Sequence, residues 1–299
     1  MNIEQECLIR NGDWDYLIVL DACRFDFFER QVNDFFHGEL LKTISAGSCT
    51  LDWCKNTFDE IEFSDVVYVS SNPFINSKKE LKGFKASKVF KKVIDVWLDD
   101  WDDNLGTVHP SKVTEAAEKT LRNNPEKMII HYLQPHEPYL FDKYKTPGFA
   151  EPSPEMNKYL SLVSNSGIEK SFPKIISCAR KINPRIRAKI KTLYLYYLQF
   201  LGRPPFSPLD DIRRRFSVEG LRDAYSLNLS IVLEEACTLY NMITAHSPGA
   251  RVVITSDHGE ILGEGREYGH VCGRNADILL KIPWFKVEKV QYGSKDHTK

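Results

Sequence analysis

This 299-residue chain contains continuous apolar runs that are separated by charged and helix-forming stretches. Four of the runs are rich in β-branched residues and lack the alternation of a half-exposed strand: residues 16–20, 66–69, 128–133 and 252–255. Runs of this kind are typical of parallel strands that are buried on both faces. They therefore predict the centre of a largely parallel sheet.

Amphipathic stretches lie between these runs. We expect helices from residue 22, over 53–58, over 111–122 with Ser111 as N-cap, and over 218–245, and a mostly helical segment over 85–124. A last strand over 278–284 contains Pro283, which favours an edge position. Alternation of strands and helices predicts an α/β protein, a three-layer α/β/α fold with a mostly parallel, doubly wound sheet.

The alternation stops between residues 140 and 217. This segment has prolines, a tyrosine-rich helical stretch over 183–201 and an excess of lysine and arginine. We interpret it as an inserted basic cap segment on one α/β domain that spans residues 1–299. Its charge suits an anionic substrate or a membrane surface, although a solvated basic face is the commoner result of such composition.

Composition narrows the class of protein. The net charge of −1 gives no indication of nucleic acid binding, and the chain has no apolar run long enough to span a membrane. Seven cysteines are scattered and odd in number, which favours reduced thiols. Because the start of the chain also lacks the pattern of a signal peptide, we expect a cytoplasmic protein. Nothing in the sequence indicates its oligomeric state.

The strand at 252–255 runs directly into Asp257, His258 and Gly259. Ligands of open α/β sheets bind beyond the carboxyl ends of the strands, so this acid and imidazole stand where a site is expected. Together they suit zinc or manganese, with magnesium or calcium as alternatives. His270 follows after a glycine-rich loop that can return to the same crevice. The alternative for a single Asp-His-Gly tripeptide is a polar turn that closes a strand.

Further polar residues follow other strands. Asp21 ends the first apolar run, and His136 stands just beyond the run at 128–133, between Pro135 and Pro138. His131 lies within that run, where a hydrogen-bonded core histidine is the better interpretation. Thr50 precedes a helical segment, so its hydroxyl either faces an anion at the helix N-terminus or serves as an ordinary N-cap.

In this order, the motifs resemble those of the alkaline phosphatase superfamily, in particular its sulfatase-like branch. The similarity rests on four sequence segments outside residues 140–217: Leu20-Asp21-x-x-Arg24-x-Asp26, Ser45 to Thr50, Pro135-His136-x-Pro138, and Ser256-Asp257-His258-Gly259-Glu260 with Gly269-His270. The resemblance implies an enzyme in which Asp21, Asp257 and His258 bind a divalent cation that also contacts the hydroxyl of Thr50.

The same resemblance implies a role for each remaining residue. Thr50 becomes transiently phosphorylated as the nucleophile. His136 and His270 bind the substrate or protonate its leaving group, because Leu140 stands where a second metal would need an acidic or histidine ligand. The implied activity is metal-dependent hydrolysis of phosphate esters.

Three alternatives remain open at the sequence level. One is phosphoryl-group transfer, as in phosphoethanolamine and phosphoglycerol transferases. Another is sulfate ester hydrolysis, although Thr50-Leu51-Asp52-Trp53 lacks the Cys-x-Pro-x-Arg motif that sulfatases need. The third is a non-catalytic α/β binding protein. For the enzymes, the expected substrate is an anionic ester, with glycan-linked and lipid-linked esters both candidates and membrane surface contact through the basic insertion.

Overall fold

An eight-stranded sheet forms the centre of the computed structural model, which describes residues 3–59, 61–149 and 183–290. The strand order is β1-β3-β10-β9-β2-β8-β4-β5. Within this sheet, β10 runs antiparallel to both of its neighbours, and the other pairings are parallel. The strands are β1 (Ile3–Glu4), β2 (Tyr16–Asp21), β3 (Phe36–Ile44), β4 (Phe63–Ser70), β5 (Phe90–Asp95), β8 (Lys127–Pro135), β9 (Val252–Ser256) and β10 (Lys281–Val290). A separate two-stranded ribbon pairs β6 (Trp101–Asp102) with β7 (Thr107–Val108).

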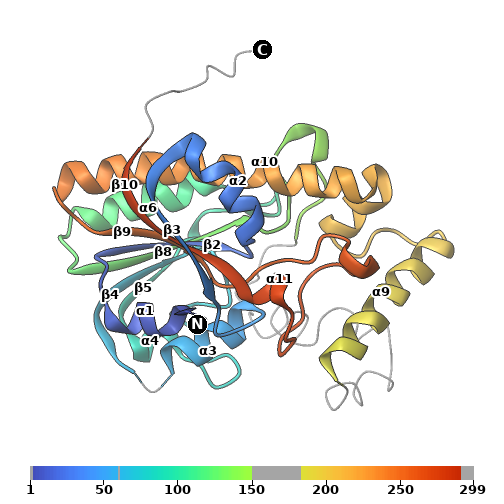
Figure 1. Cartoon of the computed structure of the whole chain (residues 1–299), viewed down its shortest axis with the longest axis horizontal. Helices are drawn as coiled ribbons and strands as arrows, with labels where there is room; N and C mark the ends of the chain where they lie inside the picture. The colour runs from blue at the N-terminus through green and yellow to red at the C-terminus, as the bar shows by residue number, and fades with distance from the viewer. Residues whose placement is uncertain (1–2, 60, 150–182, 291–299) are drawn as a thin grey trace.

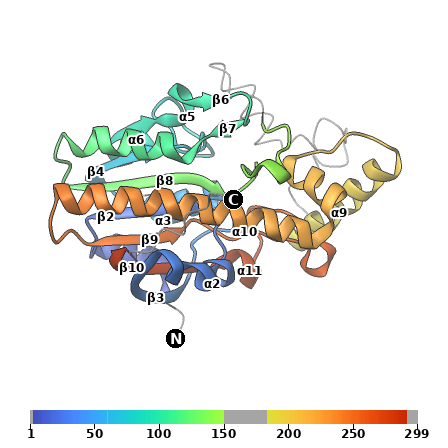
Figure 2. The ribbon, with the colours of Figure 1, turned by 90° about the horizontal axis from the view of Figure 1, so that it is seen from above.

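Helices cover both faces of the sheet (Figure 1). One layer contains α2 (Phe25–Phe35), α6 (Pro110–Leu121) and α10 (Pro208–His246), onto which Figure 2 looks from above. The opposite layer contains α1 (Gln5–Asn11), α3 (Thr50–Phe58) and α4 (Ala86–Val89). This arrangement confirms the predicted three-layer α/β/α fold.

Alternate residues of the central strand β2 belong to the two cores. Tyr16, Ile18 and Leu20 pack under α2, α6 and α10, whereas Leu17 and Val19 pack on the side of α1 and α3. Successive side chains of a strand point to opposite faces, so a strand between two helical layers must be apolar at every position. The continuous apolar run in the sequence is the consequence.

Three expectations about the strands were wrong. The segment 85–124 is not mostly helical, because β5, β6 and β7 lie within it between α4, α5 (Val96–Asp99) and α6. Strand β3 was missed because its exposed and partly exposed positions do not form an apolar run. The last strand is not an edge strand: β10 lies between β3 and β9. Pro283 is tolerated there because it stands just beyond the β10–β9 ladder, which begins at Trp284 paired with Thr255.

The region 140–217 contributes a short 3-10 turn (η1, Asp142–Tyr144), α9 (Pro184–Phe200) and the first part of α10. In Figures 1 and 2, α9 projects beyond the end of the helical layers. The helix predicted from residue 218 starts at a break in α10, where Ser217 has φ 64° and ψ −169°. Residues 150–182 of the predicted insertion lie outside the described part of the chain. Among the described helices, none is both long and apolar enough to cross a bilayer.

Candidate active site

The carboxyl ends of β2, β3, β4, β8 and β9 all open onto one edge of the sheet and supply polar side chains to a common site. Since β2 lies between β9 and β8, the residues that follow these strands come together although they are far apart in sequence. The predicted residues Asp21, Thr50, Asp257 and His258 meet at this edge. His136 and His270 lie beside them.

Thr50 is the first residue of α3 and is buried. Its Oγ1 donates a hydrogen bond to Asp257 Oδ2 at 2.8 Å and lies 3.4 Å from His258 Nε2. The segment before it must approach α3 closely: a Cβ on Gly47 would lie 2.2 Å from the backbone nitrogen of Trp53. Thr50 thus presents its hydroxyl to an acid and an imidazole at the N-terminal end of a helix, where developing negative charge is stabilised.

Backbone groups orient the second oxygen of Asp257. Oδ1 accepts hydrogen bonds from the backbone N–H groups of Ala22 (2.9 Å) and His258 (2.8 Å). Ala22 adopts a left-handed conformation, with φ 57°, to present its N–H in this way. A non-glycine residue in that region is uncommon and marks a turn constrained by its surroundings. Asp257 Oδ2 is therefore left to face Thr50.

His258 has a defined tautomer when it is neutral. Its Nδ1 lies 2.9 Å from the carbonyl oxygen of Gly259, which only accepts, so Nδ1 carries the hydrogen. The lone pair is then on Nε2, which lies 3.4 Å from Asp257 Oδ2 and 3.8 Å from Asp21 Oδ1. Gly259 allows this turn, because a Cβ there would lie 2.1 Å from the carbonyl oxygen of Ile278. His258 is thereby presented as a nitrogen ligand.

Two residues that sequence reasoning missed surround Asp21. Asn72, just beyond β4, donates through Nδ2 to Asp21 Oδ2 at 2.5 Å and lies 3.4 Å from Thr50 Oγ1. His131 is not a fully hydrogen-bonded core histidine: Nδ1 pairs with the Tyr68 hydroxyl at 2.8 Å, but the buried Nε2 has no hydrogen-bond partner among the described residues. It faces Asp21 Oδ2 at 3.6 Å. Because His131 lies within an apolar run, nothing in the sequence indicated that its imidazole faces Asp21.

The residues present fit a divalent metal ion. Asp21, His131 and Asp257 offer ligand atoms within 4.8 Å of one another, and all three side chains are buried. A buried imidazole nitrogen without a hydrogen-bond partner is costly unless something else satisfies it. Burial raises the pKa of Asp21, but the imidazoles of His131, His136 and His258 lower it below the ordinary value, so Asp21 is held as a carboxylate. Two carboxylates with imidazole nitrogens form a donor set typical of zinc and manganese.

Glu260 joins His136 and His270 in a second group. His270 Nδ1 lies 3.1 Å from Glu260 Oε2, and His136 Nε2 lies 3.9 Å from the same oxygen. The sequence did not predict this contact, although Glu260 stands two residues after His258 in the same motif. Burial raises the pKa of Glu260, but the charge of and hydrogen bond from His270, with the charges of His136 and His258, bring it to about 2.

The two imidazoles of this group differ in their electrostatics. Burial lowers the pKa of His270, and the Glu260 carboxylate does not fully offset this. Burial also lowers the pKa of His136, but the carboxylates of Asp21, Glu260 and Glu137 raise it above its ordinary value. His136 Nδ1 donates to the carbonyl oxygen of Glu137 at 2.7 Å. His136 is therefore the better proton donor of the pair, and His270 the better neutral imidazole.

A disulfide links the two halves of the site. Cys49, the residue before Thr50, is bonded to Cys272, two residues after His270. The expectation that all seven cysteines are reduced was therefore wrong. Spacing could not reveal the pair, because the two cysteines are 223 residues apart and meet only when the loop after β3 and the loop after β9 fold together.

Arg24 and Asp26, which belong to the first motif, lie on the rim of this region. Arg24 Nη2 pairs with Asp26 Oδ2 and Arg24 Nη1 with Glu264 Oε1, each at 2.8 Å. Arg24 Nη1 also donates to the carbonyl oxygen of Glu260 at 3.3 Å. These contacts connect the turn after β2 to the loop that carries His270. Their effect is to hold the two segments in place.

Solved structures share this fold over almost the whole chain. A candidate sulfatase from Bacteroides thetaiotaomicron matches with a TM-score of 0.51 at 13% identity, over 95% of this chain and 67% of that one. This chain therefore shares the fold of that protein. No protein-family model and no curated protein sequence matches this chain.

Two phosphoethanolamine transferase structures also match. The integral membrane lipooligosaccharide phosphoethanolamine transferase A from Neisseria meningitidis matches with a TM-score of 0.48 at 13% identity, over 94% of this chain. This chain spans 48% of that transferase. The C-terminal periplasmic domain of EcEptC from Escherichia coli, in complex with zinc, matches with a TM-score of 0.48 at 11% identity, over 92% of this chain and 72% of that one.

These findings bear on two sequence-based expectations. The match with a TM-score above 0.5 is to a candidate sulfatase, and the likeness is one of fold. The expectation of a cytoplasmic protein was wrong, because Cys49 and Cys272 form a disulfide and disulfides are rare in the cytoplasm. That expectation rested on the absence of a signal-peptide pattern and on an odd cysteine count, and an odd count does not exclude one bonded pair.

Proposed function

We propose that this protein is a metal-dependent hydrolase of phosphate esters that acts through a phosphorylated Thr50. One observation carries the proposal: the Thr50 hydroxyl donates to Asp257 at 2.8 Å and lies 3.4 Å from His258 Nε2, at the N-terminus of α3. A hydroxyl becomes a nucleophile when a base takes its proton and positive charge stabilises the resulting oxyanion. Asp257 is placed to take the proton, and the N-terminus of α3 together with a bound cation would supply the positive charge.

The metal ligands in this proposal are Asp21, Asp257, His258 and Thr50, with His131 as an added candidate. Asn72 and the backbone N–H groups of Ala22 and His258 orient the two carboxylates toward the common centre. When bound there, a divalent cation lowers the pKa of the hydroxyl and neutralises charge on the ester oxygens. Zinc and manganese suit this donor set best.

Two displacements complete the proposed reaction. In the first, the Thr50 hydroxyl proton passes to Asp257 Oδ2, an Oγ–phosphorus bond forms, and the phosphorus–oxygen bond to the leaving alcohol breaks. The leaving oxygen keeps the electron pair and takes a proton from His136. His270, oriented by Glu260, contacts a phosphoryl oxygen. In the second displacement, water attacks phosphorus and gives a proton to the now neutral His136, while the phosphothreonine bond breaks and Thr50 Oγ1 takes its proton back from Asp257.

Phosphoryl-group transfer is the second candidate, and it requires the same first step. It differs only in that an alcohol replaces water as the acceptor. An acceptor of this kind is supported by the phosphoethanolamine transferases among the similar structures. Sulfate ester hydrolysis is a weaker alternative, because Thr50 is not a substrate for conversion to formylglycine. The substrate class is therefore an anionic phosphate ester, with lipid-linked and glycan-linked esters both within it.

The test uses purified protein loaded with zinc or manganese. Hydrolysis of a nitrophenyl phosphodiester, phosphomonoester and sulfate is measured side by side, and intact-protein mass spectrometry follows an acid quench. We expect phosphate ester hydrolysis, and a phosphoryl adduct on Thr50 that Thr50→Ala lacks. Addition of glycerol or ethanolamine separates hydrolysis from transfer. Turnover by Thr50→Ala equal to wild type would refute the nucleophile, and no turnover with any metal would favour a non-catalytic binding protein.

A further inference from the structure

An apolar stripe that has no partner among the described residues follows one face of α9. Ile186, Leu193, Tyr197 and Phe200 lie on it at intervals of seven, four and three residues, the spacing of one helix face. Their exposed fractions are 53%, 69%, 56% and 87%. Most other large apolar side chains of the described residues are buried or partly buried. Four side chains exposed to this extent on one helix face mark an interaction surface.

The opposite face of α9 packs toward the active site. The hydroxyl of Tyr196 lies 3.5 Å from that of Tyr268, and Arg187 Nη2 donates to the carbonyl oxygen of Cys272 at 2.5 Å. Lys191 Nζ lies so near Gly269 that a Cβ there would be 2.7 Å away. All three contacts are with residues within two positions of His270. Whatever binds the stripe is therefore brought close to the mouth of the site.

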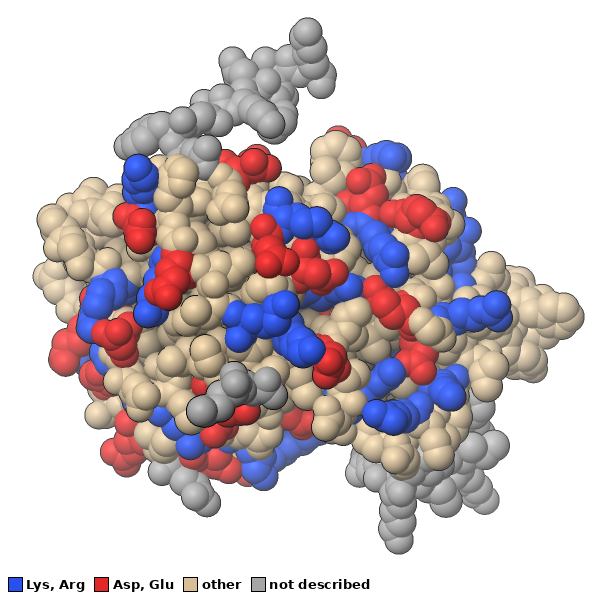
Figure 3. All heavy atoms as spheres, viewed as in Figure 1, with Lys and Arg blue, Asp and Glu red and all other residues tan. Residues whose placement is uncertain are grey.

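Positive charge accompanies the apolar stripe. The sequence of α9 contains Arg185, Arg187, Lys189 and Lys191 and no acidic residue. In the described part of the chain, no acid pairs with Arg185, Lys189 or Arg203, which are all exposed. Figure 3 shows basic side chains next to uncharged surface at the right-hand end of the molecule, where α9 lies. An apolar face with cationic flanks is typical of helices that lie on anionic membranes.

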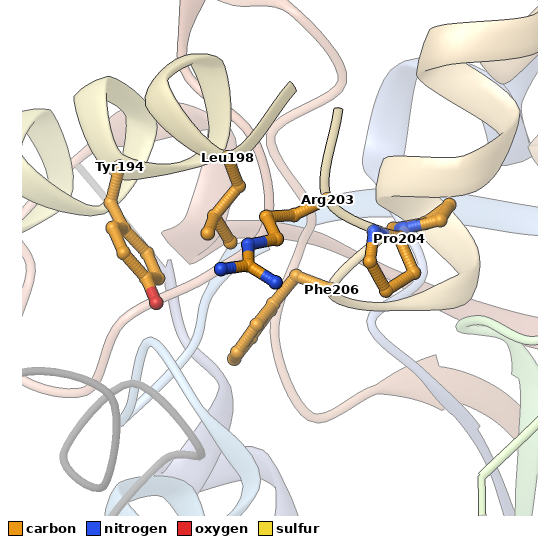
Figure 4. A pocket seen from close by; sticks show the side chains of 6 residues that line it. Tyr194, Leu198, Arg203, Pro204 and Phe206 are labelled. Atoms are coloured by element: carbon orange, nitrogen blue, oxygen red, sulfur yellow. The ribbon is translucent and has the colours of Figure 1, made fainter. Parts of the chain in front are cut away.

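A hollow at the end of α9 has the same character. It has a volume of about 440 Å³ and is lined by Tyr194, Leu198, Arg203, Pro204, Pro205 and Phe206. Figure 4 shows the Arg203 guanidinium near Leu198 and Phe206. A guanidinium beside the apolar side chains of Leu198 and Phe206 suits a phosphate group attached to an apolar body. This is the chemistry of a phospholipid.

We propose that α9 docks the protein on an anionic lipid surface, with Leu193, Tyr197 and Phe200 entering the interface and Lys189 and Arg203 meeting lipid phosphates. The evidence for this docking surface comes only from α9 and the residues next to it, and does not depend on the proposed function. That the substrate is a phosphate ester carried by the lipid surface rests on the proposed function, because it requires a working site beside α9. Docking would bring such an ester to the mouth formed by the loop of His270.

Vesicle co-sedimentation tests the docking surface. The probes are vesicles of phosphatidylcholine alone and of equal parts phosphatidylcholine and phosphatidylglycerol. We expect wild type to bind the mixed vesicles, and the affinity to fall about tenfold or more in Leu193→Ser/Phe200→Ser, because two apolar side chains lose their burial in lipid. Lys189→Glu/Arg203→Glu should weaken binding to the mixed vesicles only. Phe141→Ser, which removes an exposed aromatic side chain outside α9, is the matched control.

Several outcomes would overturn the proposal. Wild type that binds neither kind of vesicle refutes it, and so does an equal loss in Phe141→Ser. A wild-type dimer that Leu193→Ser/Phe200→Ser dissociates, measured by analytical ultracentrifugation, would assign the stripe to a second copy. A marked fall in Tm in that variant would show that another segment of the same chain packs on the stripe. Thr50→Ala should bind vesicles like wild type. Leu193→Ser/Phe200→Ser should retain turnover of a soluble ester. These two variants therefore distinguish a failure of docking from a failure of catalysis.

Discussion

Thr50 Oγ1 donates a hydrogen bond to Asp257 Oδ2 across 2.8 Å, although 207 residues separate the two in sequence. The bond joins the first turn of α3 to the residue that follows β9. It also fixes the direction of the hydroxyl, because the other oxygen of Asp257 is held by two backbone N–H groups. The reactive atom and its base are thus positioned before any substrate binds, which lowers the entropic cost of reaching the transition state.

The nucleophile can be tested by changing one oxygen. Thr50→Ala removes the hydroxyl and should lower kcat by about a thousandfold or more, as for other nucleophiles that act within a catalytic group. Thr50→Ser keeps the oxygen and should retain part of the activity. Metal content, measured by elemental analysis, should stay near that of wild type in both variants. Equal activities of the alanine and serine variants would contradict the role of Thr50.

The metal site makes a prediction about His131. His131→Gln should weaken zinc binding, because it removes the buried nitrogen that faces Asp21 at 3.6 Å. Tyr68→Phe removes the hydrogen bond that orients His131 but keeps the ring, and should lower zinc affinity by about tenfold. Competition with a zinc-binding dye measures both affinities. Wild-type affinity in His131→Gln would show that Asp21, Asp257, His258 and Thr50 suffice.

The pH dependence of activity should report His136. Nearby carboxylates raise its pKa above the ordinary 6.5 despite burial, so the imidazole is protonated below that raised pKa and loses its proton as the pH increases through it. If His136 protonates the leaving group, kcat/KM should fall on the alkaline side of the profile. His136→Gln should remove this alkaline limb.

Leaving-group dependence provides a control for the same residue. His136→Gln should slow hydrolysis of an alkyl phosphate ester by about a hundredfold, since an alkoxide needs a proton to depart. A nitrophenyl ester should be affected much less, because nitrophenolate leaves unprotonated. Equal losses for both esters would assign His136 to substrate binding alone.

The number of tightly bound ions tests the second group. We expect one tightly held ion per wild-type chain after dialysis, with Glu260 serving to orient His270. Glu260→Gln should then reduce kcat without changing metal content. Because Glu260, His136 and His270 bring three ligand atoms within 4.8 Å, elemental analysis is decisive. Two tightly held ions, one of which is lost in Glu260→Gln, would identify a two-metal enzyme.

The disulfide should position the nucleophile. Cys272→Ser releases the residue before Thr50 from the loop of His270, and we expect a loss of about 2–5 kcal/mol in the free energy of unfolding. We expect kcat to fall about ten- to a hundredfold as the two halves of the site move apart. Cys7→Ser, at an exposed free cysteine, is the control and should change neither. Thiol titration of the denatured, unreduced wild type that finds seven thiols would show that the bond is absent.

The apolar runs of the sequence determined the parallel core of the fold. Strands β2, β4, β8 and β9 are apolar on both faces, so each can be predicted from its own sequence without knowledge of its neighbours. Polar residues directly after such strands, Asp21 and Asp257 among them, were predictable site residues for the same reason: they stand at the carboxyl ends of buried strands, where ligands bind.

Tertiary structure alone decided the strand order and, with it, the neighbours of each site residue. Strand β3 reads as a strand only because β10 pairs with it, and Pro283 is acceptable inside the sheet only because of its place at the end of a ladder. His131 looks like a core residue in sequence, and becomes a candidate ligand because β8 lies beside β2 and turns its Nε2 toward Asp21.

Asn72, Glu260 and the Cys49–Cys272 bond were likewise settled by the folding of separate loops onto one edge of the sheet. Local pattern records whether a residue is buried, because burial sets the periodicity of its own element. Which residues meet depends on pairings between segments up to about the full length of the chain apart, and a single sequence carries no periodic signal for those.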